Sequence, residues 1–224
     1  MPRAHTTKTD WQTAASPYEI GSGCFSDFLY PPLMVVISTA LFAYFVWNKT
    51  PQADIPPAAT NLSPIFRVEI QYWADSISRW ADAAGLDPNL VATVMQIESC
   101  GNPRAKSSAG AMGLFQVMPY HFRTSDDPYA PDTNALRGLA YLAKSLETAH
   151  GDTHLALAGY NGGIGVIPRA EWTWSAQTKR YVQYGAPIYE NARNGLLTSP
   201  TLDEWHKRYG ASLCKQAHQR LGLP

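Results

Sequence analysis

The most regular pattern in the chain is a series of apolar residues spaced three or four positions apart, which is typical of helices that bury one face. The first series occupies residues 66–84 and is followed by a glycine, so it predicts one continuous helix. Asp87 followed by Pro88 is a good helix start and predicts a second helix that ends near Ser99. Glu98 is therefore expected in the last turn of this second helix.

The same helical spacing continues toward the C-terminus. A third helix is expected after Asp132, and a short fourth helix at 154–160. Segments 177–184 and 201–221 are also helical in pattern, and the second of them opens with a Thr-Leu-Asp-Glu sequence that fits a capping box. No convincing run of alternating strands is present. The fold class is therefore expected to be mainly α, with at most a small hairpin within the glycine-rich stretch 103–119.

A different pattern precedes these helices. Residues 28–47 (FLYPPLMVVISTALFAYFVW) carry no charge, and such a stretch is long enough to cross a bilayer core of about 30 Å. Aromatic residues lie near both ends, as in the interfacial belts of membrane helices. Two prolines shorten the continuous helix to 33–47, which leaves an amphiphilic surface helix or the core of a signal sequence as alternatives. The length and the absence of a cleavage site favour a single retained transmembrane helix.

These patterns divide the chain into four parts. Residues 1–27 form an N-terminal tail, 28–47 the transmembrane helix, 48–64 a linker rich in Pro and Ala, and 65–224 a folded domain. The few charges near the apolar segment do not set its orientation. We expect a single-pass protein of the cell membrane with its folded domain on the extracytoplasmic side, only because the chemistry described below needs a substrate there.

Charge and cysteine content exclude several classes of site. Lys+Arg and Asp+Glu both total 18, so the formal net charge is zero and no nucleic-acid partner is expected. The three cysteines lack the spacing of metal ligands, so no metal site is expected either. Cys24 precedes the predicted membrane helix, so only Cys100 and Cys214 could pair. Their disulfide is a hypothesis, and two buried thiols are the alternative.

Glu98 is the acidic residue whose position is most informative. It lies next to Ile97 and four residues after Val94, at the edge of the apolar helix face, so it should be partly buried. Burial and the negative C-terminal end of the helix both disfavour a carboxylate, so both should raise its pKa. A carboxyl group with a raised pKa can act as a general acid near neutral pH. From periodicity alone, a surface or salt-bridged glutamate remains the alternative.

Two further motifs follow along the chain. Residues 107–116 (SSAGAMGLFQ) contain small residues and glycines, which let the backbone approach a ligand closely, and end in Gln116, whose amide needs hydrogen bonds if it is buried. Residues 156–163 (ALAGYNGG) end a helix with Tyr160 and Asn161 before a double glycine. Taken alone, the first motif is a hairpin turn and the second a helix cap with a core tyrosine.

In this order the motifs resemble those of the lytic transglycosylase family, the soluble-lytic-transglycosylase domain related to goose-type lysozyme. Residues 97–99 (IES) are similar to the segment that bears the catalytic glutamate, and 109–116 to the Gly-Leu-Met-Gln motif with its preceding serine. Residues 159–161 (GYN) are similar to the Ala-Tyr-Asn motif, and 178–182 (TKRYV) to the last motif, in which a tyrosine returns to the cleft. The resemblance implies an α+β, lysozyme-like catalytic domain.

The resemblance also implies a reaction. The family cleaves peptidoglycan glycan strands with one glutamate, here Glu98, which acts first as an acid and then as a base. The substrate supplies the nucleophiles through its N-acetyl group and the C6 hydroxyl of muramic acid, so the product is a 1,6-anhydro sugar. Two-carboxylate glycosidases work differently, and this chain offers one carboxylate at a matching position. No metal or cofactor is required.

The matching residues around the acid receive roles from the same resemblance. Ser107 would help to orient the reacting groups, and Gln116 would bind sugar amide groups. Tyr160 would hold the glutamate and the saccharide, while Asn161 would fix the backbone of its motif. Tyr181 would line the glycan cleft. These five residues are the expected substrate-binding set.

Three positions depart from the family pattern. Phe115 replaces the usual Met, Gly159 replaces Ala, and Gln177 stands where the family often has Glu before the threonine. The first two replacements are conservative in volume or backbone demands. The third puts any support role of a carboxylate at that position in doubt, but none of the three removes the expected acid.

Two alternatives to this function are open at the level of sequence. One is a goose-type muramidase in which water replaces the C6 hydroxyl, positioned by Asp126, Asp127 or Asp132. The other is a membrane-tethered module that binds glycan or serves as a scaffold without turnover. The released ends of the glycan separate the first alternative, and substitution of Glu98 separates the second.

Overall fold

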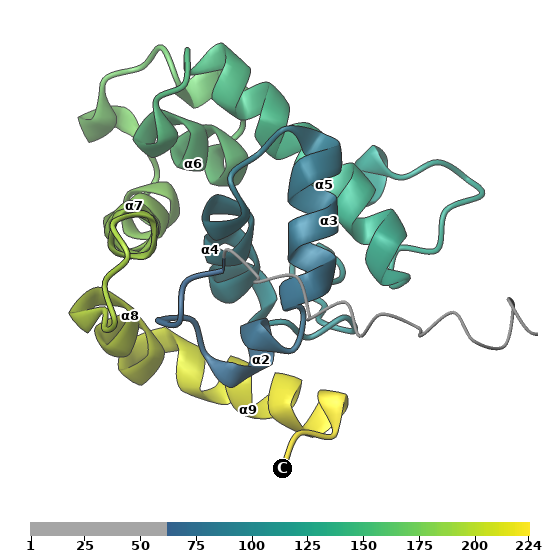
Figure 1. Ribbon diagram of the computed structural model, residues 1–224. Coiled ribbons are helices and arrows are strands. Elements are labelled where there is room, and N and C mark those ends of the chain that lie inside the picture. Colours follow the sequence, from purple (N-terminus) through teal and green to yellow (C-terminus); the bar gives the residue numbers. More distant parts are fainter. Residues whose placement is uncertain (1–61) are drawn as a thin grey trace, which may run out of the picture. The chain divides into compact units, whose positions relative to one another are not determined.

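The computed structural model describes residues 62–224, and the regular elements in this part are all helices (Figure 1). Two isolated antiparallel bridges, Lys106–Met112 and Met112–Val117, mark the expected small hairpin region, so the described part is mainly α as expected. None of the helices within 62–224 has the length and apolarity needed to span a bilayer. The predicted transmembrane helix at 28–47 lies outside the described residues, as do the tail and nearly all of the linker.

The prediction of one helix over 66–84 was wrong, because the structure breaks it in two. Helix α2 covers Val68–Gln71 and helix α3 covers Ala74–Ala84, with Trp73 between them at φ −94° and ψ 6°. The indole Nε1 of Trp73 donates a hydrogen bond to the carbonyl oxygen of Gly101 over 2.9 Å. This contact with a segment far along the chain accompanies the break, whereas apolar spacing alone carries no information about it.

Helix α4, Pro88–Ser99, lies in the middle of the described part (Figure 1) and is in contact with α2, α3, α7 and α9. Its start is fixed by Asp87, whose side chain accepts a hydrogen bond from the Asn89 N–H over 2.7 Å. The other carboxylate oxygen of Asp87 accepts one from the Tyr189 hydroxyl over 3.1 Å. The helix ends at Cys100, which adopts a left-handed conformation with φ 51°. Glu98 therefore lies in the last turn, as predicted.

The remaining elements surround α4 and are connected mostly by short loops. The α-helices are α5 Pro131–Thr148, α6 Thr153–Gly162, α7 Ala176–Arg193, α8 Pro200–Trp205 and α9 Ala211–Leu221. Short 3-10 turns occur at Pro119–His121, Ile164–Val166 and Glu171–Thr173, and a π-helical turn, His206–Gly210, joins α8 to α9. The expected third and fourth helices are thus present, and α7 extends well beyond the predicted 177–184.

The start of the C-terminal helical segment differs from the predicted capping box. The N-cap of α8 is Ser199, whose hydroxyl oxygen accepts a hydrogen bond from the Leu202 N–H over 3.2 Å. Pro200 occupies the first helical position, where proline is favoured because its missing N–H needs no partner. Thr201 is therefore already inside the helix, and the capping-box prediction was wrong by two residues.

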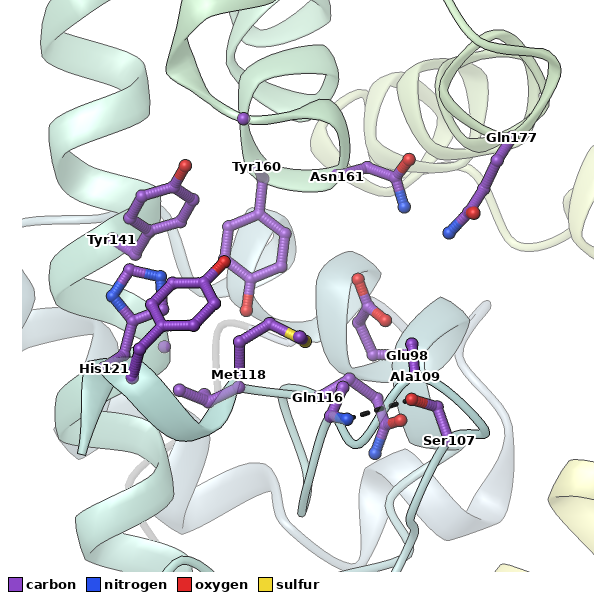
Figure 2. A pocket seen from close by; sticks show the side chains of 15 residues that line it. Glu98, Ser107, Ala109, Gln116, Met118, His121, Tyr141, Tyr160, Asn161 and Gln177 are labelled. Atoms are coloured by element: carbon purple, nitrogen blue, oxygen red, sulfur yellow. Dashed lines mark hydrogen bonds between the residues drawn. The ribbon is translucent and has the colours of Figure 1, made fainter.

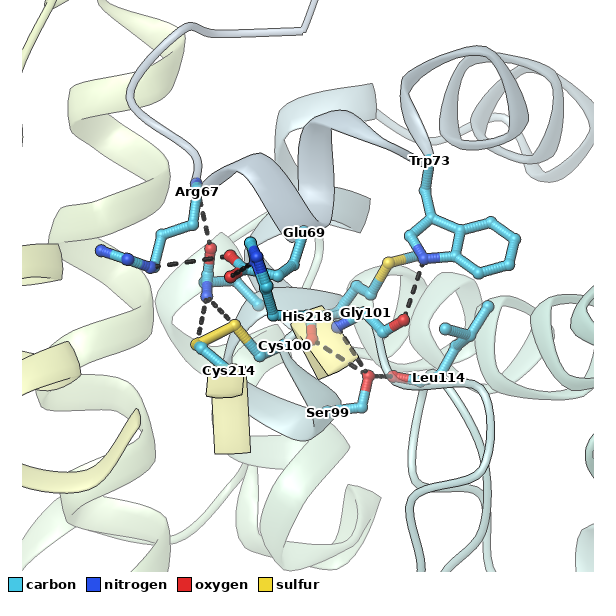
Figure 3. Close-up of a disulfide and its surroundings, with 11 residues drawn as sticks. Arg67, Glu69, Trp73, Ser99, Cys100, Gly101, Leu114, Cys214 and His218 are labelled. Atoms are coloured by element: carbon cyan, nitrogen blue, oxygen red, sulfur yellow. Dashed lines mark hydrogen bonds and ion pairs between the residues drawn. A yellow bond between two sulfur atoms is a disulfide. The ribbon is translucent and has the colours of Figure 1, made fainter. Parts of the chain in front are cut away.

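A disulfide joins Cys100 at the end of α4 to Cys214 in α9, with 5.0 Å between the two Cα atoms (Figure 3). The hypothesis of a disulfide is thus confirmed over that of two free thiols. Beside it lies the buried Glu69, which pairs with His218 Nδ1 at 3.2 Å. The Glu69 carboxylate and the two sulfurs lie within 4.8 Å of one another, but sulfurs joined in a disulfide provide no thiolate for a metal ion.

Candidate active site

Glu98 lies at the boundary between two neighbouring pockets, which have volumes of about 220 and 210 Å3. Glu98, Asn161 and Gln177 line both of them. In Figure 2 the Glu98 carboxyl group points into the space between Gln116 and Ser107 on one side and Asn161 and Gln177 on the other. The two pockets therefore meet at this carboxyl group.

The environment of Glu98 favours its protonated form. The side chain keeps some solvent contact at the pockets, but the surrounding protein removes most of the water, and this desolvation raises its pKa from 4.5 to about 8. An interaction with the Tyr181 hydroxyl lowers the pKa, but by less than burial raises it. The carboxyl group is therefore protonated at neutral pH, as expected from its place at the edge of an apolar helix face.

Tyr181 approaches Glu98 from helix α7. Its side chain is buried, and this burial, with a smaller contribution from the charge of Glu98, raises the pKa of its phenol well above the usual value. The hydroxyl group interacts with the carboxyl group of Glu98. Within residues 62–224, however, it forms no hydrogen bond of good geometry. A buried hydroxyl without a fixed partner is available to whatever binds beside the acid.

Tyr160 faces the first pocket from helix α6. Its hydroxyl donates a hydrogen bond to the carbonyl oxygen of Phe115 over 2.7 Å, so this proton is not directed at Glu98. Burial raises the pKa of the Tyr160 phenol well above its usual value, and the charge of Glu98, when that group is ionised, adds to the rise. A direct hydrogen bond that holds the glutamate, as the resemblance implied, is not formed in this structure.

The glycine-rich loop supplies Ser107 and Gln116 to the first pocket. The Ser107 hydroxyl oxygen accepts a hydrogen bond from the Ala111 N–H over 3.0 Å, which closes the loop on itself. Gln116 has a left-handed backbone with φ 46°, and its amide nitrogen donates to the Gly113 carbonyl over 3.0 Å. The amide group of Gln116 is thereby oriented, and its oxygen remains available at the pocket.

Asn161 connects the two helices that border the site on the other side. Its side-chain oxygen accepts a hydrogen bond from the Thr178 hydroxyl over 3.2 Å, which ties the end of α6 to the start of α7. Thr178 is itself held by the N-cap Ser175, whose hydroxyl oxygen lies 2.9 Å from that of Thr178. Tyr181 follows one turn later on α7, so this link helps to set where the phenol lies.

A row of aromatic rings was not anticipated from the sequence. The ring centroids of Tyr120 and His121 are 4.6 Å apart, those of His121 and Tyr141 4.7 Å, and those of Tyr141 and Tyr160 5.9 Å. All four residues line the first pocket. Burial lowers the pKa of His121, which favours its neutral form. Tyr120 and His121 come from a short 3-10 turn and Tyr141 from α5, and no sequence motif marked any of them.

The aspartates considered as alternative catalytic groups lie elsewhere. Asp126 forms an ion pair with Arg137 over 2.7 Å, and Asp132 accepts a hydrogen bond from the Trp80 indole over 2.7 Å. Asp127 accepts one from the Tyr129 N–H over 2.9 Å. None of the three lines either pocket, and Glu98 is the only carboxylate among the residues that do.

The structure explains the glycine at position 159. A Cβ atom added there would lie 2.3 Å from the hydroxyl oxygen of Ser145 and 2.7 Å from Cδ1 of Ile167. The Ser145 hydroxyl in turn donates to the Ala156 carbonyl over 2.7 Å. Glycine at position 159 therefore fits its neighbours Ser145 on α5 and Ile167, which follows the 3-10 turn Ile164–Val166. A comparison of the motif alone does not reveal these contacts.

Comparison with known proteins identifies the segment that carries the site. The family model described as the transglycosylase SLT domain matches residues 75–182. A transglycosylase from Enterobacteria phage PRD1 is 40% identical over 114 residues, covering 50% of this chain and 40% of the phage protein. The membrane-bound lytic murein transglycosylase C of Salmonella arizonae is 32% identical over 160 residues, covering 61% of this chain and 43% of that protein.

Among solved structures, the lytic transglycosylase Slt of Pseudomonas aeruginosa, determined as an inactive mutant, aligns with a TM-score of 0.46 and 27% identity, covering 60% of this chain and 26% of that one. The chain spans less than half the length of the two relatives above, at 40% and 43%. The matched segment contains Glu98, the glycine-rich loop 107–116 and the pair Tyr160 and Asn161. Residues 75–182, which carry this site, therefore match the lytic transglycosylase family.

Proposed function

We propose that this chain is a peptidoglycan lytic transglycosylase that cleaves the β-1,4 bond between N-acetylmuramic acid and N-acetylglucosamine and leaves a 1,6-anhydro-muramic acid end. The observation that carries the proposal is the state of Glu98. It is the only carboxylate that lines either pocket, and burial raises its pKa to about 8, so it is protonated when a substrate arrives. A single protonated carboxyl group suits a reaction in which the substrate supplies the nucleophile.

In the proposed reaction Glu98 first gives its proton to the glycosidic oxygen. The bond from that oxygen to C1 of muramic acid breaks, and the N-acetyl oxygen of the same sugar bonds to C1 in its place. Glu98, now a carboxylate, takes the proton of the C6 hydroxyl as the C6 oxygen displaces the N-acetyl group from C1. The carboxyl group is restored, the N-acetyl group is released unchanged, and no metal or cofactor takes part.

Five polar residues are proposed to bind the substrate around the acid. Gln116 would accept or donate to a sugar N-acetyl group, and Ser107 would orient the reacting groups at the mouth of the loop. Tyr160 would contact the saccharide from above the loop, while Asn161 would hold its own motif against α7. Tyr181, whose buried hydroxyl lacks a hydrogen bond, would donate to the substrate or to the carboxylate form of Glu98.

We also propose that the domain works outside the cytoplasm, held to the membrane by the predicted helix at 28–47. The disulfide between Cys100 and Cys214 supports this location, because such bonds persist in oxidising compartments and are rare in the cytosol. The relatives named membrane-bound lytic murein transglycosylase C are in accord with it. Peptidoglycan strands are the proposed partner, together with the membrane, and no nucleic acid is involved.

The released ends of the glycan test the reaction. Purified sacculi treated with the protein should yield muropeptides that end in anhydro-muramic acid, which mass spectrometry recognises by the loss of one water. The muramidase alternative predicts reducing ends instead, and the aspartates that it would use lie away from both pockets. Exclusive reducing ends would reject the transglycosylase.

Replacement of the acid tests whether the chain turns over at all. The Glu98→Gln variant keeps a side chain of the same size but cannot donate a proton at neutral pH, so release of muropeptides should fall by at least about 100-fold. A scaffold or binding module predicts that the wild-type protein releases nothing. Lysis by the variant at the wild-type rate would remove Glu98 from the mechanism.

A further inference from the structure

The second pocket, on the other side of Glu98, has a different chemical character from the first. Its wall is built partly by residues that follow the segment matched by the family model. Tyr184 comes from the middle of α7, while Trp205 and Tyr209 come from the end of α8 and the π-helical turn. Arg180, one position before Tyr181, also lines this pocket.

Arg180 is the only lysine or arginine among the residues that line either pocket. The first pocket presents hydroxyl, amide and ring groups, with Glu98 as its only carboxylate. Such a surface suits uncharged N-acetyl sugars. A permanent positive charge in the second pocket suits an anion, so the two pockets differ in the charge that they favour.

The guanidinium group of Arg180 is oriented by an aromatic ring. It lies over the ring of Tyr209 at 5.2 Å from the centroid, and Tyr209 packs edge-to-face on Tyr184 with 5.6 Å between ring centroids. Stacking occupies the flat face of a guanidinium and leaves the N–H groups at its edge free to bind a carboxylate.

No acidic residue within 62–224 forms a salt bridge with Arg180. The neighbouring Glu204 is instead paired with Arg208 over 2.9 Å. The causes that set the pKa of Glu98 are burial and Tyr181. The charge of Arg180 is thus neither neutralised by a partner nor used to tune the acid.

The segment between α8 and α9 places the aromatic residues that line the second pocket. The π-helical turn His206–Gly210 brings Tyr209 beneath Arg180, and single π-helical turns are frequent at functional sites. A Cβ atom on Gly210 would lie 2.4 Å from the ring of Trp205. Only glycine allows this ring to stay where it lines the pocket.

We propose that Arg180 binds a carboxylate carried by the lactyl branch of muramic acid, and so makes the site specific for strands that are acidic at this position. The inference rests on the proposed function. In a glycan strand of this type the sugar rings themselves are uncharged, and the acidic groups belong to the lactyl branch: to the peptide stem attached to it, or to the lactyl carboxylate when the stem is absent. Because Glu98 lines both pockets, a strand cleaved there lies next to the pocket that Arg180 lines.

Binding to three matched glycans tests the proposal, with Glu98→Gln as the background so that no ligand is cleaved. The first glycan is a tetrasaccharide with peptide stems, and the second is the same strand after an amidase has removed the stems. The third is the stripped strand with its lactyl carboxylates converted to amides, which has no charge. Arg180→Gln is compared with Arg169→Gln, an exposed arginine that lines neither pocket.

We expect Arg180→Gln to weaken binding of at least one acidic glycan by about tenfold, since a hydrogen bond to a charged group is lost, and to leave the neutral strand unaffected. Loss on the stem-bearing strand identifies the peptide carboxylates, and loss on the stripped strand identifies the lactyl carboxylate. Equal loss on the neutral strand, or no loss on either acidic strand, would overturn the proposal.

Release of anhydro ends from sacculi by the chain with Glu98 intact keeps this result separate from the proposed function. If that protein releases them while Arg180→Gln binds all three glycans as its parent does, or weakens all three equally, only the assignment of Arg180 fails. If it releases none, the proposed function fails whatever the binding data show. Arg169→Gln should match its parent in every assay.

Discussion

The hydroxyl group of Tyr160 donates a hydrogen bond to the carbonyl oxygen of Phe115 across the candidate active site, over 2.7 Å. The donor lies on α6, and the acceptor lies in the glycine-rich loop next to Gln116. One contact therefore links the two walls of the first pocket. The position of the loop depends on the same phenol that is proposed to contact the saccharide.

Substitution Tyr160→Phe should destabilise the protein by about 1–3 kcal/mol, because it leaves the carbonyl of the fully buried Phe115 without this partner. Chemical denaturation of the purified protein measures the change in the free energy of unfolding. Tyr120→Phe is the control, since the Tyr120 side chain is 75% exposed and should change stability little. Equal stability of the two variants would show that the hydrogen bond contributes nothing.

Substitution Glu98→Gln should raise stability in a pH-dependent way. The folded chain holds a proton on Glu98 up to about pH 8, whereas a carboxyl group with the ordinary pKa of 4.5 loses it earlier. Between these values the folded state binds more protons, so the contribution of Glu98 to the free energy of unfolding falls as pH rises, by at most about 1.4 kcal/mol per pH unit. Glutamine lacks this loss. The free energy of unfolding of the variant minus that of wild type should therefore be larger at about pH 7.5 than at about pH 4.5. The same difference at both pH values would refute the raised pKa of Glu98.

Substitution Tyr181→Phe should shift the pH dependence of glycan cleavage. Tyr181 lowers the pKa of Glu98, so its removal should raise that pKa further above the value of about 8. Because the protonated acid is the active form in the proposed mechanism, the alkaline limb of kcat/KM should move to higher pH. Tyr184→Phe, on the same helix, is the control because Tyr184 does not contribute to this shift. Movement of the limb to lower pH would contradict the assigned interaction.

Substitution Gly159→Ala should cost roughly 1–3 kcal/mol, although the related family motif carries alanine, because the added methyl group collides with Ser145 and Ile167. The cost should be smaller in a Ser145→Ala background, which removes the nearest atom. A double-mutant cycle of unfolding free energies measures this coupling. Strict additivity would mean that Ser145 is not the group that requires glycine.

Reduction of the disulfide should lower the free energy of unfolding by about 2–5 kcal/mol, because the bond closes a loop of more than 100 residues in the unfolded chain. Thermal unfolding with and without a phosphine reductant measures the loss. The Cys100→Ser/Cys214→Ser variant should match the reduced protein and be insensitive to the reductant. A reductant effect of the same size on this variant would mean that the bond is not responsible.

The helical character and the place of Glu98 were predictable because both depend on local patterns. Apolar spacing and the Asp87-Pro88 start defined α4, and the same spacing put Glu98 at the edge of its buried face. The contacts around Glu98 were less accessible. Tyr160 was expected to hold the glutamate, but its proton goes to Phe115, a partner distant in sequence that no periodic pattern specifies.

The same reason explains what the sequence did not predict. Trp73 interrupts the first predicted helix where its indole binds Gly101, a contact between separate segments. Tyr141 and His121 enter the pocket from segments without a motif, and they meet only in the folded chain. Gln177, noted only as a departure from the family pattern, lies where the two pockets meet.

Helix α4 is held at both of its ends. Asp87 is bound by the Tyr189 hydroxyl at the beginning, and Cys100 is covalently joined to α9 two residues after Glu98. Glu98, the proposed proton donor, lies on this fixed helix, so its backbone has little freedom to move toward the glycosidic oxygen. In the proposed reaction the sugar must therefore adjust to the protein. The pyranose ring has to distort until its glycosidic oxygen reaches the Glu98 carboxyl group, whose position is fixed by the fold.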